Sequence, residues 1–249
     1  MRKISRVSGR TGYARAMSAA LRPRLTWIDL LRGVAVIGMI ETHVMHTVLS
    51  AEFDGLQREL SFYNGLLAPA FLWIAGFVQG LSIRKAQLVG RPVVTVARLR
   101  RLGFIALLGY LLHVPWDRWL AGDFGAESWR IALQADILQC MAVSLTLLLL
   151  AGMARGGWFD VITGLLAAGF VFAAPAAQHW HTGVVGIDAF LNHNGGSLFP
   201  LFPWVAFCAT GCLMSRWEIS WKTLVPASLV FIALGMFFVP ATYSYVHPS

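Results

Sequence analysis

Residues 26–49 read TWIDLLRGVAVIGMIETHVMHTVL, an apolar stretch interrupted by charged and imidazole side chains. About 20 apolar residues cross a bilayer as one helix, so this stretch is long enough to span. One face of that helix carries Asp29, Arg32, Met39, His43 and His46, which we call the polar stripe. Asp29 and Arg32, three positions apart, can pair with each other. Ionisable side chains inside a span are costly unless they face the protein interior, so the stripe is a candidate functional site.

The whole chain has the composition of a membrane protein. It is 57% hydrophobic and 13% charged, with a mean hydropathy of +0.64, whereas soluble domains carry about 25% charged residues. This excludes an ordinary cytosolic enzyme, a disulfide scaffold and a disordered tail. Seven apolar blocks follow one another: 26–49, 62–83, 102–116, 134–153, 158–176, 198–215 and 222–240.

These blocks predict an all-α, polytopic integral membrane bundle of about seven transmembrane helices. Residues 1–25 would form a basic N-terminal segment and residues 26–249 the membrane domain. The chain stops soon after the seventh block, and we expect a complete bundle to continue into further helices. Cys140, Cys208 and Cys212 all lie in apolar blocks and are expected to be small buried side chains.

The charged residues predict the orientation. Sixteen Lys and Arg fall on the side of the N-terminus and three on the opposite side, with Arg32 inside the first block. The positive-inside rule therefore places the N-terminus in the cytoplasm of a multi-pass inner-membrane protein. Orientation also explains the net charge of +8, and no nucleic acid partner is expected. All seven histidines fall toward the outer side: His43, His46, His113, His179, His181, His193 and His247.

Three further features are open to more than one interpretation. Gly76 and Gly80, spaced as GxxxG, favour close helix packing. Asp136 and Gln139 share one face at the outer start of the fourth block, where Asp136 is either a helix cap or part of a site. The loop 179–195 holds imidazole and carboxylate groups without a rigid metal-binding spacing, so no metal is expected.

Several segments together resemble a known family. Residues 24–33 (RLTWIDLLRG), followed ten residues later by His43, resemble the opening of the transmembrane acyltransferase superfamily. Within it the sequence is most similar to bacterial relatives of heparan-alpha-glucosaminide N-acetyltransferase. Three more segments of residues 24–215 fit in order: 69–76 (PAFLWIAG), 136–139 (DILQ) and 199–204 (FPLFPW).

The resemblance implies an acyltransferase that moves an acetyl or other acyl group from cytoplasmic acyl-CoA to an extracytoplasmic sugar or amino sugar. The acceptor would be a glycan or a lipid-linked sugar, and no cofactor would be bound permanently. His43 would be the general base, with His46 as the alternative because residues 47–60 contain no histidine. The residues that would bind the acyl donor are Asp29, Arg32, Arg98, Arg100 and Arg101. Asp136 and Gln139 would lie on the acceptor side.

Two other functions also account for the polar residues. A transporter would use Asp29, Arg32 and Glu41 as an intramembrane charge relay. A b-type haem protein would use His113 with His43 or His46 as axial ligands. The sequence leaves open the acceptor, the acyl chain, an acyl-histidine intermediate and a homo-oligomer.

Overall fold

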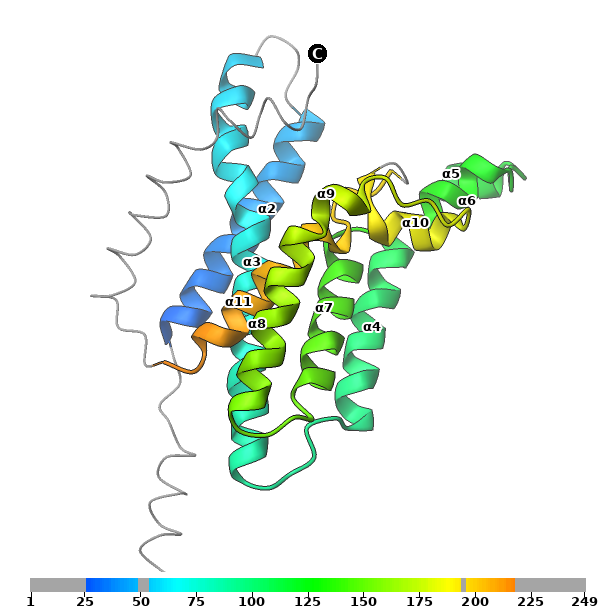
Figure 1. The fold of residues 1–249 in the computed structure, drawn as a ribbon. Helices are drawn as coiled ribbons and strands as arrows, with labels where there is room; N and C mark the ends of the chain where they lie inside the picture. Colours follow the sequence, from blue (N-terminus) through cyan, green and yellow to red (C-terminus); the bar gives the residue numbers. More distant parts are fainter. Residues whose placement is uncertain (1–25, 49–53, 194–195, 218–249) are drawn as a thin grey trace, which may run out of the picture.

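The computed structural model describes residues 26–48, 54–193 and 196–217, and all regular secondary structure in these ranges is helical (Figure 1). The predicted span 222–240 and the basic segment 1–25 lie outside the described residues. The described helices are α2 (Thr26–Val48), α3 (Asp54–Leu88), α4 (Val96–Leu112), α5 (Trp116–Leu120), α6 (Ala126–Ala132), α7 (Ile137–Ala151), α8 (Gly157–Phe172), α9 (Ala174–Ala177), α10 (Val185–Leu191) and α11 (Leu201–Met214).

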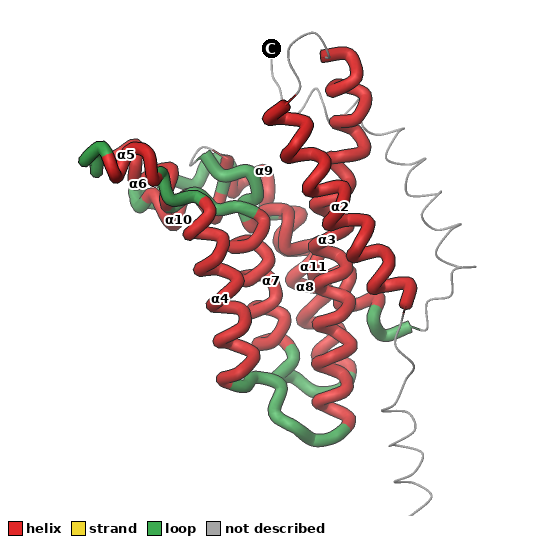
Figure 2. The backbone as a smooth tube through the Cα atoms, turned by 180° about the vertical axis from the view of Figure 1, so that it is seen from behind, coloured by secondary structure: helices red, strands yellow, loops and turns green. Residues whose placement is uncertain are grey.

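The longer helices run alternately between the two ends of a bundle (Figures 1 and 2). The connections 89–95 and 152–156 lie at one end, which we call the inner end after the predicted orientation. The segments 113–136 and 173–200, with α5, α6, α9 and α10, lie at the opposite, outer end. Basic residues gather at the inner end: Arg84, Lys85, Arg91, Arg98, Arg100, Arg101, Arg155 and Arg216.

One helix of the described residues, Gly65–Leu88, is long and apolar enough to cross a membrane. A second span is counted if α6 and α7, which are bent by 56° at their junction, form one broken span. The helices α8 and α11 are apolar but shorter. The all-α prediction is thus confirmed for the described residues, while seven spans and a cytoplasmic N-terminus stay predictions.

The predicted bounds of the third apolar block, 102–116, are wrong. Helix α4 begins six residues earlier, where the Thr95 side chain accepts a hydrogen bond from the Arg98 amide and caps the helix. It ends at Leu112, and Trp116 begins the separate helix α5. Pro115 explains the break, because a proline disfavours helical backbone in the residue before it.

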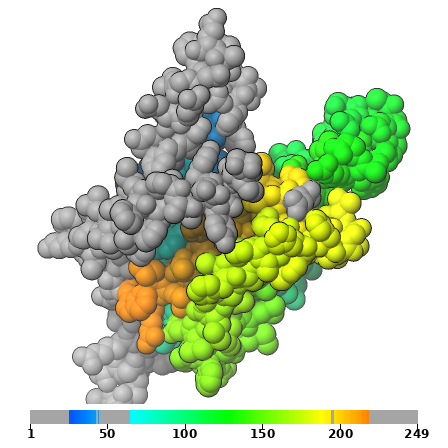
Figure 3. All heavy atoms as spheres, turned by 45° about the horizontal axis from the view of Figure 1, so that its top comes forward, coloured from blue at the N-terminus to red at the C-terminus, as the bar shows by residue number. Residues whose placement is uncertain are grey.

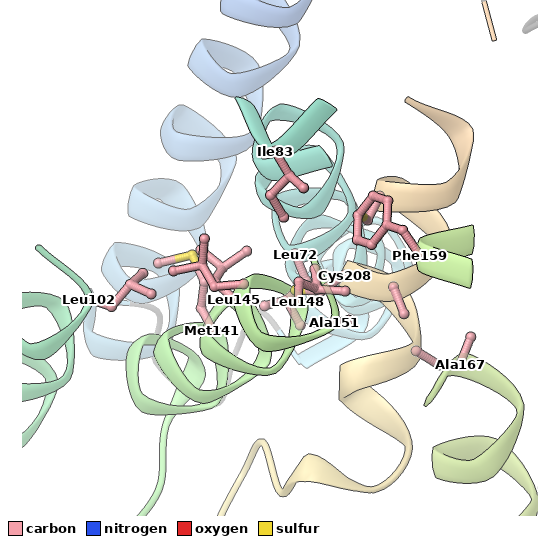
Figure 4. Packing of buried hydrophobic residues seen from close by; sticks show 14 of the residues in the cluster. Leu72, Ile83, Leu102, Met141, Leu145, Leu148, Ala151, Phe159, Ala167 and Cys208 are labelled. Atoms are coloured by element: carbon pink, nitrogen blue, oxygen red, sulfur yellow. The ribbon is translucent and has the colours of Figure 1, made fainter. Parts of the chain in front are cut away.

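Helix α11 packs against α3, α7 and α8 in the centre of the bundle (Figure 1). The main hydrophobic core is built from these helices and α4 (Figure 4). Its fully buried side chains include Leu72, Leu148, Phe159 and Cys208. All three cysteines are buried and free, as predicted.

The GxxxG segment on α3 allows α11 to approach closely. A Cβ atom at Gly76 would overlap the backbone carbonyl of Cys208, and one at Gly211 would overlap that of Trp73. A Cβ at Gly80 would likewise collide with Ser215 and Cys212. The close-packing interpretation of the two α3 glycines is therefore confirmed.

Candidate functional site

A charged cluster joins three helices at the inner end. Arg84 of α3 donates from Nη2 to Asp160 Oδ1 of α8 at 2.5 Å and from Nε to Ser215 Oγ at 3.2 Å. Arg216 Nη1 lies 3.2 Å from the other Asp160 oxygen. The Arg84 guanidinium also lies 5.1 Å from the centre of the Phe159 ring. Asp160 therefore accepts from two arginines and ties α3 and α8 to the end of α11.

An open pocket of about 230 Å³ lies between the two inner connections. Its lining includes two arginines, Arg91 and Arg155, one from each connection. The Gln87 amide, in the last turn of α3, donates to the carbonyls of Gly152 and Ala154 at 2.8 Å and so holds the 152–156 connection against α3. Two exposed guanidinium groups beside a hollow are suited to a phosphate-bearing ligand, which arginine recognises through paired hydrogen bonds.

The predicted donor residues on α4 have different environments. Arg98 donates to the Val93 carbonyl at 2.7 Å and to Ser82 Oγ at 2.8 Å, so its guanidinium holds the 89–95 connection against α3. Arg100 and Arg101 are exposed in the first turns of the same helix. All three lie at the inner end, and their role in donor binding stays a prediction.

The polar stripe lies on α2, which packs along α3. The α3-facing side of α2 is apolar, with Ile28 and Ala35 buried. Asp29 is half-buried and Arg32 is exposed near the start of the helix. Met39, half-buried, packs against the main core. The predicted bases His43 and His46 fall in the last turns, where their side chains lie outside the described residues.

A histidine–carboxylate pair forms at the outer end. His113 Nε2 at the end of α4 lies 3.5 Å from Asp136 Oδ2 at the start of α7. The other ring nitrogen, Nδ1, lies 3.0 Å from the Gly109 carbonyl, which only accepts, so Nδ1 carries a proton. Both side chains are about a quarter exposed, at 22% and 25%. An incoming ligand can therefore reach both side chains.

Asp136 and Gln139 are brought together as a capping box. Asp136 Oδ1 accepts from the Ile137 amide at 2.7 Å, and Gln139 Oε1 accepts from the Asp136 amide at 3.2 Å. Gln139 is fully buried and donates to the Gln134 carbonyl at 3.4 Å. Asp136 therefore both caps α7 and faces His113, whereas the contacts of Gln139 are structural.

The outer loop between α9 and α11 is held by its own polar groups. Asp188 Oδ1 accepts from the Thr182 hydroxyl at 2.6 Å and from the Thr182 amide at 2.7 Å. These hydrogen bonds lower the pKa of the Asp188 carboxyl from its usual value. His193 Nδ1 lies 2.9 Å from the Ser197 carbonyl. In the part of the chain that the structure describes, no group of three or more His, Cys, Asp or Glu is placed to hold a metal.

The described helices thus form a bundle that is cationic at one end and bears a histidine–carboxylate pair at the other. Comparison with protein families identifies the class. The chain belongs to the family described as heparan-alpha-glucosaminide N-acetyltransferase, catalytic, which matches residues 24–234. The family is membrane-associated, and the match confirms the predicted resemblance. No curated protein and no solved structure matched the chain.

Sequence reasoning missed two of these groupings. His113 lies 23 positions before Asp136, and only the packing of α4 on α7 brings the two together. Arg84 and Asp160 are likewise distant in the sequence. A signal did exist for the second grouping, because Asp160 is an acidic residue in the first turn of an otherwise apolar helix.

Proposed function

We propose that this protein is a membrane acyltransferase that takes an acetyl or other acyl group from acyl-CoA at its inner end. The group passes to an amine or hydroxyl of an extracytoplasmic sugar or amino sugar at the outer end. The observation that carries the proposal is the family match, which covers residues 24–234 and so includes both ends of the bundle.

The inner end supplies groups for the anionic donor. Coenzyme A carries phosphates, and the pocket between the inner connections is lined by Arg91 and Arg155. Arg100 and Arg101 add exposed positive charge on the neighbouring helix. The eleven residues from Arg32 to His43 span about 16 Å of helix. That distance is comparable to the reach of an extended pantetheine arm, which would carry the thioester toward the outer half.

Transfer requires one proton acceptor near the thioester carbon. The acceptor nitrogen or oxygen forms a bond to the acyl carbon, the carbon–sulfur bond breaks, and the leaving thiolate receives a proton. His43 would remove the proton from the acceptor and return it to the sulfur, so the reaction has no net proton change. His46, one turn further along α2, is the alternative base. Asp136, with His113 beside it, would bind the acceptor.

Two observations weigh against the other functions. Both ring nitrogens of His113 face protein oxygens, at Gly109 and Asp136, so neither is presented to a haem iron. A charge relay for transport would need Asp29, Arg32 and Glu41 to line one path, yet Glu41 lies on a different face of α2 from Asp29 and Arg32.

The test is transfer of a labelled acetyl group from acetyl-CoA to a panel of sugars and amino sugars by protein in liposomes. His43→Ala should abolish transfer while His181→Ala, at an exposed outer histidine, should leave it unchanged. If His43→Ala retains wild-type turnover and His46→Ala does not, His46 is the base. If both retain it, the proposed mechanism is wrong.

A further inference from the structure

A short helical hairpin projects sideways from the outer end of the bundle. It consists of α5, α6 and their connection, residues 116–132, and we call it the outer hairpin (Figures 1 and 2). Trp119 holds it together, with ring centres 5.9 Å from Phe124 and 5.2 Å from Trp129. The space-filling view shows the hairpin as a knob that stands clear of the remaining bundle (Figure 3).

The exposed surface of the outer hairpin combines large apolar and aromatic side chains with charged ones. Leu120 is 85% exposed, and Trp116, Phe124 and Trp129 are 57%, 58% and 48% exposed. Four such side chains on a projection of this size are more than the scattered apolar residues usual on a soluble surface.

The charged groups of the outer hairpin face one another. Arg118 lies 3.9 Å from Asp123, and Arg130 lies 3.5 Å from Glu127. Asp123 also accepts hydrogen bonds from the Gly125 amide and the Ser128 hydroxyl, and these contacts lower its pKa. These charged groups therefore have partners within the hairpin, whereas the indole N–H of Trp119 is buried there without a hydrogen-bond partner among the described residues.

The apolar surface of α4 leads directly into the outer hairpin. Along this helix large side chains are exposed as far as its last turn: Phe104, Leu107, Leu108, Leu111 and Leu112. Trp116 and Leu120 continue this surface after the break at Pro115. Helix α4 has 17 residues, a rise of about 25 Å, which approaches the roughly 30 Å thickness of the hydrocarbon layer. The hairpin therefore lies about one hydrocarbon thickness from the basic inner end.

We propose that the outer hairpin lies in the headgroup region of the outer leaflet, with Trp116, Leu120, Phe124 and Trp129 at the boundary with the acyl chains. Tryptophan favours this depth because its ring is apolar while its N–H is polar. The proposal rests on the membrane-spanning arrangement of the proposed function, and its occupant is the lipid surface.

Site-directed spin labelling in liposomes tests the depth. Labels are placed by Leu120→Cys on the hairpin, Phe104→Cys at the middle of α4 and His181→Cys in an exposed outer turn. The native cysteines are all buried, so they should not react. Collisions with molecular oxygen, which partitions into lipid, are compared with collisions with a water-soluble nickel chelate. The label at 120 should favour oxygen and lie between the other two in depth.

Three results would overturn the inference. A label at 120 that collides mainly with the nickel chelate, as at 181, places the hairpin in water. Strong dipolar broadening between labels at 120 places it against a second copy of the chain. If the label at 104 is itself in water, the membrane-spanning arrangement fails and with it the proposed function. A label at 104 in lipid with one at 120 in water leaves the proposed function intact.

Discussion

His113 Nε2 lies 3.5 Å from Asp136 Oδ2, and this contact joins the C-cap residue of α4 to the N-cap residue of α7. The same carboxylate caps α7 through its other oxygen, at 2.7 Å from the Ile137 amide. The Asp136 side chain therefore has two tasks: the first is to cap the start of α7, and the second is to place a carboxylate at the outer end of the bundle. The two tasks can be separated by mutation.

Asp136→Asn should keep the helix cap and remove the charge, because asparagine caps helices as well as aspartate. We expect nearly unchanged thermal stability but weaker use of the acceptor, seen as a raised KM for the sugar. Asp136→Ala should in addition lose about 1 kcal/mol of stability with the cap. Equal loss of stability in both variants, or an unchanged acceptor KM in Asp136→Asn, would contradict the second task.

Gly76→Ala should destabilise the protein strongly. The added methyl group meets the backbone of α11 at Cys208, which cannot move aside as a flexible side chain can, so we expect a loss of about 3 kcal/mol or more. Gly103→Ala is the matched control, because nothing lies within 4 Å of a Cβ there. It should stabilise α4 by up to about 1 kcal/mol. Chemical denaturation in detergent measures both, and equal effects would show that the glycine contact is unimportant.

Asp160→Asn should loosen the inner end. The substitution removes the charge that Arg84 and Arg216 share, and we expect a loss of about 1.5–3 kcal/mol, as for hydrogen bonds to charged groups. Glu127→Gln removes an exposed ion-pair partner of Arg130 and should cost about 0–1 kcal/mol. The thermal midpoints of the two variants report the difference, and a smaller effect for Asp160→Asn than for Glu127→Gln would refute the cluster's role.

The outer loop should lose its order only in strong acid. The pKa of Asp188 is lowered by its hydrogen bonds from Thr182, so the stability they contribute is present above the unfolded-state pKa and is lost as the pH falls through the lower, folded-state value. Hydrogen exchange should show the Thr182 amide protected until the pH is below the usual carboxyl pKa of about 3.9. Asp188→Asn should remove this pH dependence. Complete loss of protection in the wild type above pH ~3.9 would contradict the assignment.

The helical composition and the charge asymmetry of the bundle follow from local sequence. Apolar blocks and clustered arginines can be identified from the sequence alone. The predicted blocks overlap the observed ranges of α2, α7, α8 and α11. The close approach at Gly76 was also predictable, because GxxxG places two small residues on one helix face. Asp136 was correctly placed at a helix start, where the structure adds a capping box.

Other features depend on packing that the sequence does not encode locally. The break at Pro115 ends α4 at Leu112, inside the predicted span 102–116, and Trp116 begins the projecting hairpin. Arg98 cannot be distinguished from its neighbours Arg100 and Arg101 in the sequence, yet its guanidinium donates hydrogen bonds to Ser82 and to the Val93 carbonyl. The partners of Asp136 and Asp160 come from other helices, so they required the fold.

Binding of acetyl-CoA to the detergent-purified protein tests the central claim most directly, because it requires no knowledge of the acceptor. Calorimetry should show saturable binding that Arg32→Ala weakens, because the Arg32 side chain would contact the donor. His43→Ala should leave the affinity nearly unchanged, because His43 would act only in the transfer step. Free coenzyme A should compete. A folded protein that binds neither acetyl-CoA nor coenzyme A would contradict the acyltransferase account.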